Sequence, residues 1–483
     1  MNYAKTGWWQ SLSLMLLAAV LRFWHLGTPH AVVFDETYYV KDAWALLNFG
    51  YEVDALNDAN DMMLAGETDI FTDQPSYVVH PPFGKWVIAV GQWAFGLNPF
   101  GWRFMVALLG VLAVVMVHRI SRRLFHNELA AWLAGMFMAI DGMAIVMSRT
   151  ALLDQTLMFT TLAGFGAIVL DRDWLKNRLA NGDSYWFRPW LIVGGIFLGL
   201  AVATKWSGLW FLVIGGLLVI FFTARTRISL GHYRPWLRAI WIDTMPWLLP
   251  IVAIVLGVYL LSWTGWFLSD DAWYRNWAIA NPDKQNFLPP ALRGLLEYHI
   301  SAWNFHTNLT SPHSYQSNPW SWPLQLRPTS FYFESYESGD PGCASGPCAA
   351  EVIPLGNPLI WWAGTAALFH QVWLGVTKRS ASSIAVVSFF LAGWAPWLLY
   401  QYRTIFAFYS IAFAPYVMMA LAMSLVYLLG DPNRGIQRRN RAFAVGGFAL
   451  ATVLLSIFFL PIWNGEIVST PYWQLHMWLT SWV

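Results

Sequence analysis

The chain has 483 residues, of which 57% are hydrophobic and only 12% are charged, and its formal net charge is +2. Soluble domains carry about 25% charged residues, so this chain cannot cover a soluble surface and is predicted to be an integral membrane protein. The small net charge excludes intrinsic disorder and a basic nucleic-acid-binding surface. The long, continuous apolar runs disfavour an outer-membrane β-barrel.

A membrane-crossing helix needs about 20 predominantly apolar residues. Eleven segments qualify: 8–26, 101–118, 128–147, 151–170, 189–204, 206–223, 243–263, 356–376, 382–399, 404–429 and 441–461. The stretch 83–97 is shorter and lies between Pro81-Pro82 and Asn98-Pro99, so we interpret it as a re-entrant or interfacial helix. We predict an all-α membrane protein with these regions: first span 1–26, outer catalytic loop 27–100, spans 2–7 in 101–263, outer substrate-binding loop 264–355, spans 8–11 in 356–461, outer tail 462–483.

The basic residues favour one orientation. With a cytoplasmic N-terminus, 18 of the 29 lysines and arginines fall on the inner side, as the positive-inside rule requires: Lys5, Arg119, Arg122, Arg123, Arg172, Lys176, Arg178, Arg188, Arg225, Arg227, Arg234, Arg238, Lys378, Arg379, Arg434, Arg438, Arg439 and Arg441. No inner loop is long enough for a nucleotide-binding domain, which needs about 100 residues. We therefore predict a multi-pass plasma-membrane protein whose active site and C-terminus are extracytoplasmic.

Two adjacent carboxylates, Asp35 and Glu36, follow the first span and lie between apolar residues. Partial burial of a carboxyl group raises its pKa and suits it to act as a general base. The acids between Asp54 and Asp73 are interpreted as a solvated loop face. The first outer loop therefore contains the candidate catalytic pair.

Several charged or titratable side chains lie at the predicted outer membrane level: Arg22, His80, Lys85, Arg103, Arg149, Asp154, Lys205 and Arg403. Ionisable groups at membrane depth are costly and indicate function, and arginine suits bidentate contacts to phosphate. The set therefore predicts a site for a lipid phosphate. Structural alternatives are an Arg149–Asp154 ion pair, a snorkelling Lys205 and a proline turn at His80.

The second outer loop is rich in aromatic residues and histidine. His313, Tyr315, Trp320 and Trp322 could bind a sugar or a peptide, or could form an interfacial aromatic belt. Cys343 and Cys348 are expected to form a local disulfide in an oxidising compartment. No metal-binding motif occurs, and we interpret Asp171-Arg172-Asp173, on the inner side, as a chance match to nucleotide-sugar enzymes.

Six short motifs occur in order on the predicted outer side: Phe34-Asp35-Glu36-Thr37-Tyr38-Tyr39, His80-Pro81-Pro82-Phe83-Gly84-Lys85, Ser148-Arg149-Thr150-Ala151-Leu152-Leu153-Asp154, Ala203-Thr204-Lys205-Trp206-Ser207-Gly208, Ser311-Pro312-His313-Ser314-Tyr315 through Pro319-Trp320-Ser321-Trp322-Pro323, and Gly356-Asn357-Pro358. With these motifs the chain resembles the protein O-mannosyltransferases, most closely the actinobacterial branch. The resemblance spans about residues 20–430.

The resemblance implies a GT-C glycosyltransferase that transfers mannose, with inversion, from polyprenyl-phosphate mannose to Ser or Thr of secreted or membrane proteins. It assigns Asp35 as the general base and Glu36 as the residue that orients the acceptor or the base. Arg22 and Arg103 correspond to family arginines near the lipid phosphate. The lipid-linked donor is a substrate, so no cofactor is expected. Residues 264–355 are too short for the β-trefoil (MIR) domain of eukaryotic members, which we predict to be absent.

Other functions remain as alternatives. The same fold could transfer a sugar to a lipid or glycan acceptor. A transporter would need polar residues near the bilayer midplane, whereas the polar groups here gather at the outer boundary. A non-catalytic membrane subunit would tolerate Asp35→Asn. The expected partners are the donor, protein acceptors and membrane lipids, with no nucleic acid; whether the protein translocation machinery binds is left open.

Overall fold

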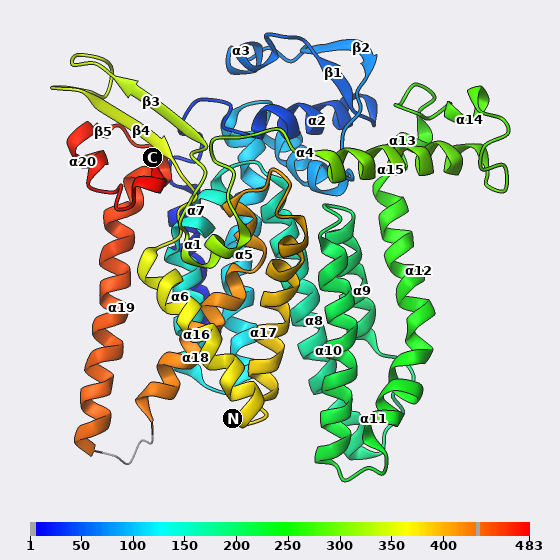
Figure 1. The fold of residues 1–483 in the computed structure, drawn as a ribbon, viewed down its shortest axis with the longest axis vertical. Helices are drawn as coiled ribbons and strands as arrows, with labels where there is room; N and C mark the ends of the chain where they lie inside the picture. The colour runs from blue at the N-terminus through cyan, green and yellow to red at the C-terminus, as the bar shows by residue number, and fades with distance from the viewer. Residues whose placement is uncertain (1–5, 431–434) are drawn as a thin grey trace.

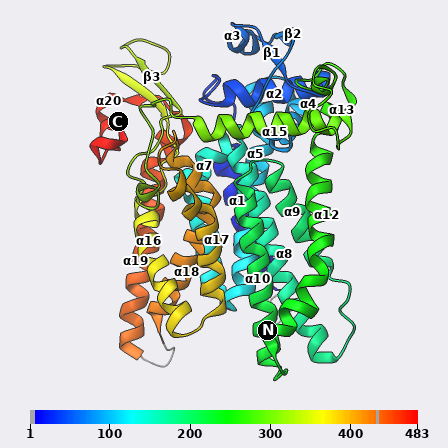
Figure 2. The same cartoon turned by 45° about the vertical axis from the view of Figure 1, so that its right-hand side comes forward.

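The computed structural model describes residues 6–430 and 435–483, so Lys5 and Arg434 of the predicted inner set lie outside the described residues. The long helices run side by side as a bundle (Figure 1). The two regions predicted as outer loops and the C-terminal tail gather at one end of this bundle, in both views of the ribbon (Figures 1 and 2). Residues 27–100, 264–355 and 462–483 thus lie at the same end of the bundle.

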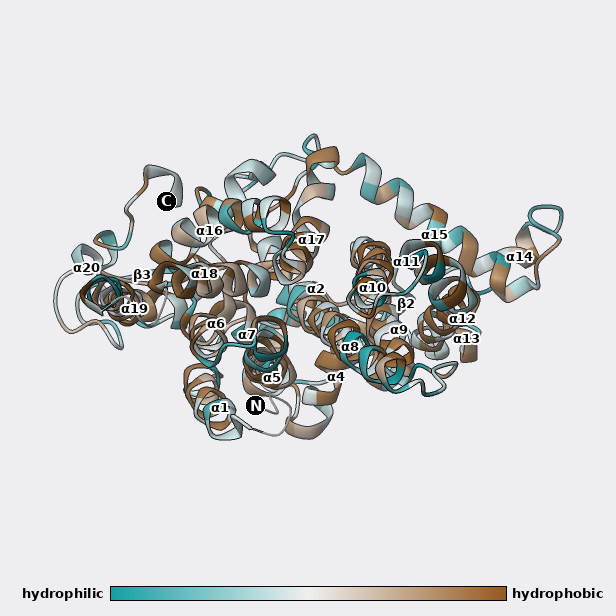
Figure 3. Ribbon diagram, turned by 90° about the horizontal axis from the view of Figure 1, so that it is seen from below, coloured by the Kyte–Doolittle hydropathy of each residue, from teal (hydrophilic) through white to brown (hydrophobic). Residues whose placement is uncertain are grey.

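Within residues 6–430 and 435–483, seven helices are long and apolar enough to cross a membrane. They are α5 (Pro99–Phe125), α8 (Leu153–Asn181), α10 (Gly208–Ser229), the run Pro235–Ser262 made of α11 (Pro235–Arg238), η1 (Ala239–Thr244) and α12 (Met245–Ser262), α16 (Pro358–Thr377), α17 with η3 (Ala381–Trp394, Ala395–Tyr400), and α19 (Gly435–Asn464). The bent pair α6 (Glu128–Ile140) and α7 (Gly142–Arg149) adds an eighth. Seen along the bundle, these helices are predominantly hydrophobic (Figure 3).

The three remaining predicted spans correspond to shorter apolar helices: α1 (Trp8–Phe23), α9 (Pro189–Val202) and α18 (Ala414–Leu429). Their lengths of 16, 14 and 16 residues fall below the span criterion. The helical multi-pass prediction is therefore confirmed, while seven or eight segments rather than eleven are long enough by length and composition.

Two predicted spans are not continuous helices. The segment 404–429 contains the 3-10 turn η4 (Ala407–Ala412) before α18, where Pro415 lies in the first turn, a position suited to a residue without an N–H. The segment 128–147 bends by 54° at Asp141. There, the Asp141 carboxylate accepts hydrogen bonds from the backbone N–H groups of Ala144 and Asn357 and from the indole of Trp361.

The first outer region is a layer on the end of the bundle. It contains α2 (Glu36–Phe49), α3 (Ala59–Leu64), α4 (Phe83–Phe95) and the antiparallel strands β1 (Val53–Ala55) and β2 (Phe71–Pro75). Helix α4 occupies the stretch predicted to be an interfacial helix and packs on α2 and α5. Its Gly91 permits the close approach to α5, because a Cβ there would lie 2.4 Å from the carbonyl oxygen of Gly101.

The second outer region contains α13 (Thr264–Leu268), α14 (Trp277–Ala280), α15 (Pro290–Asn308), η2 (Pro319–Leu324), β3 (Tyr332–Tyr336) and β4 (Cys348–Val352). Helix α15 lies across the end of the bundle (Figure 2). Strand β5 (Val468–Ser469) of the tail pairs with β4, and α20 (Thr470–Gln474) and η5 (Thr480–Trp482) follow it. The predicted Cys343–Cys348 disulfide is confirmed.

Candidate active site

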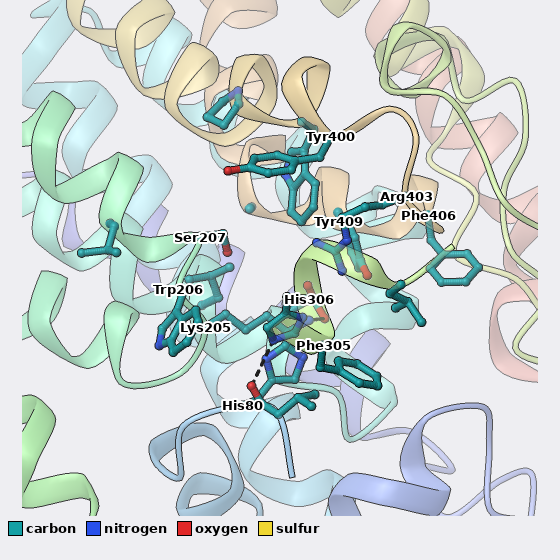
Figure 4. A pocket seen from close by; sticks show the side chains of 18 of the residues that line it. His80, Lys205, Trp206, Ser207, Phe305, His306, Tyr400, Arg403, Phe406 and Tyr409 are labelled. Atoms are coloured by element: carbon teal, nitrogen blue, oxygen red, sulfur yellow. Dashed lines mark hydrogen bonds and ion pairs between the residues drawn. The ribbon is translucent and has the colours of Figure 1, made fainter. Parts of the chain in front are cut away.

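A cavity of about 1040 Å³ lies between the outer layer and the bundle. Its walls come from α2, the segment 76–80 before α4, the turn between α9 and α10, the end of α15, and the segment from η3 to η4. Six of the predicted site residues, which are far apart in the sequence, line it together: Asp35, His80, Lys85, Asp154, Lys205 and Arg403. Figure 4 shows part of this cavity, with His80 and Lys205 facing Tyr400, Arg403 and Tyr409.

Asp35 occupies the N-cap position of α2, and its side chain makes no capping hydrogen bond. The preceding Phe34 has a φ of 50°, which is strained for a bulky residue. Its ring stacks on Phe331 at 4.6 Å and meets Phe408 edge-on at 5.5 Å, so aromatic packing holds this turn. Burial raises the pKa of Asp35 to about 6, with Lys205 opposing the shift and Asp154 adding to it. The site thus contains a carboxyl group suited to general-base chemistry near neutral pH.

Lys205 pairs with Asp154. The Nζ atom of Lys205 lies 2.7 Å from Oδ2 of Asp154 and 5.2 Å from the centre of the Tyr409 ring. The predicted Arg149–Asp154 ion pair is therefore wrong, because Asp154 pairs with Lys205 instead. Arg149 is closer to Asp154 in the sequence, but the fold brings Lys205, which follows α9, next to it. The snorkelling interpretation of Lys205 does not fit either, because its side chain is 10% exposed.

Lys85 is also balanced by acids. It is fully buried and donates a hydrogen bond to Glu52, while Oδ2 of Asp42 lies 3.7 Å from its Nζ. Burial raises the pKa of Asp42 to about 7, and Lys85 opposes this shift. The predicted phosphate ligand Lys85 thus already has carboxylate partners.

Arg403 differs from the two lysines because its guanidinium has no ion-pair partner among the described residues. Its Nε is buried and unpaired within that part of the chain. Lys205 and Lys85 are charge-balanced by Asp154 and Glu52, so Arg403 is the strongest candidate in the cavity wall to bind an added anion. Residues 6–430 and 435–483 contain no group of three or more His, Cys, Asp or Glu that could hold a metal ion.

Two histidines face each other beside these cations (Figure 4). The rings of His80 and His306 lie 5.1 Å apart, and Nε2 of His306 contacts the carbonyl oxygen of Val79 at 3.0 Å. Burial lowers the pKa of His306 to about 4 and that of His80 well below its ordinary value, and Lys205 lowers both further. Both rings are therefore neutral at pH 7. A carbonyl oxygen only accepts, so the Nε2–H of a neutral His306 is donated to Val79 and its Nδ1 is left as an acceptor.

The predicted catalytic residue Glu36 does not line the cavity. Its side chain is fully buried and accepts four hydrogen bonds: two from Arg103, at 2.8 and 2.9 Å, and one each from the backbone N–H groups of Val33 and Ala151. The Glu36 carboxylate is therefore engaged by Arg103 and by the backbone rather than by the cavity. Arg103, which was predicted to bind the donor phosphate, does not line the cavity either. Its guanidinium pairs with Glu36.

Arg22 and Arg149 were also predicted at the phosphate, and the structure places both elsewhere. Arg22 is fully buried and donates to the carbonyl oxygens of Met138 and Ala139, at the bend between α6 and α7. Arg149 donates to the carbonyl oxygens of Arg22, Trp24 and His25, at the end of α1. Both arginines satisfy carbonyl groups that the helix ends leave free.

The predicted acceptor-binding residues of the second loop lie outside the cavity wall. Trp322 is fully buried and donates to Ser317, so it is a core residue. Trp320 is 62% exposed and packs edge-on against Trp394. His313 is the nearest of the four, because its ring lies 5.0 Å from Phe406, which does line the cavity, and Tyr315 packs under Arg327.

The cavity also contains residues that the sequence analysis missed. These are Tyr39 and Asp42 on α2, Tyr77 before α4, Trp303 and His306 on α15, and Tyr400 and Tyr409. The amphipathic spacing of Tyr298, Ala302 and His306 could have predicted α15. Tyr298 fastens this helix to the loop before α4, because its hydroxyl contacts both the N–H and the carbonyl oxygen of Val78.

One side of the cavity is apolar. Leu209, Trp210 and Val213 of α10 and Pro396 and Trp397 of η3 are among its apolar lining residues. The three α10 side chains are 46%, 39% and 56% exposed, so the cavity opens between spanning helices. An amphiphile could therefore place a charged group beside Arg403 and its apolar part along this opening.

Comparison with known proteins identifies one protein family over almost the whole chain. The family model described as dolichyl-phosphate-mannose-protein mannosyltransferase matches residues 12–273, and the C-terminal four-transmembrane region of protein-O-mannosyltransferase matches residues 291–482. A polyprenol-phosphate-mannose–protein mannosyltransferase of Mycolicibacterium smegmatis is 34% identical, with 99% of this chain and 93% of that protein covered.

Solved structures show the fold. The Pmt1–Pmt2 complex of Saccharomyces cerevisiae, bound to its sugar donor, matches with a TM-score of 0.73 at 17% identity, covering 98% of this chain and 92% of that one. ArnT of Cupriavidus metallidurans, bound to undecaprenyl phosphate, matches with a TM-score of 0.53 at 16% identity, covering 95% and 75%. The predicted GT-C fold is confirmed, and the chain belongs to the protein O-mannosyltransferase (PMT) family of membrane mannosyltransferases.

Proposed function

We propose that the protein transfers mannose from polyprenyl-phosphate mannose to Ser or Thr hydroxyls of exported proteins, with inversion at the anomeric carbon and with Asp35 as general base. The observation that carries the proposal is a single cavity in which the Asp35 carboxylate lies near Lys205 and Arg403. The name of the mycobacterial relative supports the same donor and the same kind of acceptor.

The donor's phosphate would bind Arg403 and the Lys205 ammonium, and its isoprenoid chain would follow the opening between α10 and η3. When the glycosidic C–O bond breaks, the phosphate leaves with an additional negative charge. Fixed cations stabilise charge that develops in a transition state, and an N–H group of His80, which lines the cavity, would add a hydrogen bond there.

The acceptor hydroxyl would attack the anomeric carbon from the side opposite the phosphate while Asp35 takes its proton. A double displacement with retention would need a carboxylate nucleophile close to the second carboxylate. Asp154 is engaged by Lys205 at 2.7 Å, and Glu36 is saturated by Arg103 and two backbone N–H groups. Asp42, a further acid of the cavity wall, lies about 10 Å from Asp35 along α2, about twice the separation of a retaining pair. These positions leave Asp35 suited to one direct displacement.

The site would face the extracytoplasmic side of the plasma membrane, with the N-terminus in the cytoplasm. The basic residues predicted on the inner side support this orientation through the positive-inside rule. In that compartment the acceptors would be secreted or membrane proteins, reached during or after export.

The proposal is tested with the full chain in lipid nanodiscs, polyprenyl-phosphate mannose and a Ser/Thr-rich peptide. We expect mannosylated peptide whose anomeric configuration, read by NMR, is opposite to that of the donor. A retained configuration would overturn the single-displacement mechanism. Transfer only to an added lipid or glycan acceptor, with the peptide unmodified, would establish the alternative acceptor class.

Arg403→Gln is expected to weaken binding of polyprenyl phosphate by about 10- to 100-fold, because a hydrogen bond to a charged group contributes about 1.5–3 kcal/mol. The measurement is a binding isotherm in nanodiscs for the wild type and the variant. Lys284→Gln, which removes an exposed lysine of the second outer region, should bind polyprenyl phosphate like the wild type. An equal loss in both variants would indicate a general surface-charge effect instead.

A further inference from the structure

Helix α2 presents a second acid to the cavity besides Asp35. Asp35, Tyr39 and Asp42 are spaced i, i+4 and i+7, which places them on one face of a helix, and all three line the cavity. Seven residues of α-helix rise about 10 Å. This separation accommodates one pyranose ring, with the acceptor oxygen between the ring and Asp35 and a hydrogen bond between the ring's hydroxyl groups and Asp42.

The contacts of Asp42 leave its carboxylate available. Its nearest cation is Lys85, whose Nζ lies 3.7 Å from Oδ2, a separation longer than an ordinary hydrogen bond. Lys85 donates instead to Glu52, which balances its charge. The Asp42 side chain is 14% exposed and Lys85 is 1% exposed, so Asp42 is the member of this trio that can contact a ligand.

A second polar group at the same end of the cavity lacks a partner. The hydroxyl oxygen of Tyr77 is buried and unpaired within residues 6–430 and 435–483, and Tyr77 lines the cavity beside Ser76. A ligand that supplied hydroxyl groups would satisfy this phenol and the Asp42 carboxylate together. The rings of Tyr39 and Tyr77 add apolar faces of the kind that pack against the C–H face of a sugar.

The negative charge and the enclosure around Asp42 indicate which part of the donor or acceptor fits there. A carboxylate repels a phosphate, and an isoprenoid chain offers no hydrogen-bond donor. A polypeptide acceptor needs an open passage, whereas Asp42 lies against the buried Lys85–Glu52 pair. From these contacts, and resting on the proposed function, we infer that Asp42, with the Tyr77 hydroxyl, binds hydroxyl groups of the donor's sugar.

The inference is tested with Asp42→Asn in the full chain, by measuring binding of polyprenyl-phosphate mannose and of sugar-free polyprenyl phosphate. We expect affinity for the mannosylated lipid to fall about 10- to 100-fold, as for a hydrogen bond to a charged group, while affinity for the sugar-free lipid stays at the wild-type value. Tyr77→Phe, which keeps the ring, should lower affinity for the mannosylated lipid alone by a few fold. Glu67→Gln, an exposed acid of the same outer region, should change neither.

A set of monodeoxy-mannose donors locates the contact. One deoxy donor should bind the wild type more weakly but should lose little further affinity in Asp42→Asn, because the two changes remove the same interaction. Equal loss for both lipids, no loss for either, or a rise only in the peptide KM would each overturn the sugar assignment. Failure of the proposed function would look different, since the wild type itself would then transfer no mannose.

Discussion

Asparagine in place of Asp35 is expected to lower mannose transfer by about 100- to 10 000-fold, the usual contribution of a positioned general base. The amide has nearly the same size as the carboxylate but cannot take the proton of the acceptor hydroxyl. Because the Asp35 side chain makes no capping hydrogen bond in α2, the substitution should leave the fold intact. Initial rates of peptide mannosylation at saturating donor provide the measurement.

The pH dependence provides a second measurement on the same residue. Burial raises the pKa of Asp35 to about 6, and the base acts in its deprotonated form. The value of kcat/KM should therefore fall about tenfold per pH unit below pH 6 and level off above it. In Asp35→Asn this acidic limb should be absent from the residual rate.

Binding of polyprenyl phosphate is the control, and it should match the wild type because Arg403 and Lys205 are untouched. Wild-type turnover in Asp35→Asn, or an unchanged acidic limb, would remove Asp35 from the base role. A joint loss of lipid binding and turnover would instead indicate a misfolded cavity.

Breaking the Arg103–Glu36 pair should cause the largest loss of stability among the substitutions considered. Glu36→Gln leaves the Arg103 guanidinium charged and buried, and removal of one partner of a buried pair costs about 3–5 kcal/mol. Both side chains are almost fully buried. Thermal unfolding in detergent, followed by the fluorescence of the tryptophans, would measure the loss.

The chain offers a matched control for this prediction. Arg178 and Asp183 form an ion pair whose side chains are 44% and 46% exposed, so Arg178→Ala should cost less than about 1 kcal/mol. A double variant, Glu36→Gln with Arg103→Met, should recover part of the lost stability because no lone charge stays buried. A stable single variant, or a double variant no better than it, would contradict a stabilising role of this pair.

Much of the site follows from the sequence by composition and position. Long apolar segments predicted the helices, and the outer location of polar residues predicted one shared site. Asp35, His80, Lys205 and Arg403 indeed line one cavity. Their side chains differ from the surrounding apolar sequence, and so membrane depth alone was enough to select them.

The arginines Arg22, Arg103 and Arg149 do not line the cavity, for a physical reason. Each donates to backbone carbonyl groups where helices or loops end inside the protein. A carbonyl group without a partner costs several kcal/mol in an apolar environment, so such ends need donors as much as a phosphate does. The sequence does not reveal where these carbonyl groups are left, because they depend on the bend at Asp141 and on the end of α1.

Glu36 and the second loop illustrate a further limit. Asp35 and Glu36 are neighbours on α2, and a helix points adjacent side chains in different directions, so one faces the cavity and the other faces Arg103. In the second loop, Trp322 and His306 are both aromatic residues near the membrane surface. Only tertiary packing places Trp322 in the core and His306 beside His80.

The stacking of Phe34 on Phe331 has a consequence for chimaeras that combine segments of different relatives. Asp35 belongs to the N-terminal half of the chain, but the Phe331 ring that holds its turn lies just before β3, in the C-terminal half. Neither half alone therefore defines the geometry of the reaction. Chimaeras that join halves from different relatives should lose turnover unless both aromatic partners come from one parent, and natural exchange of segments across this boundary should be correspondingly rare.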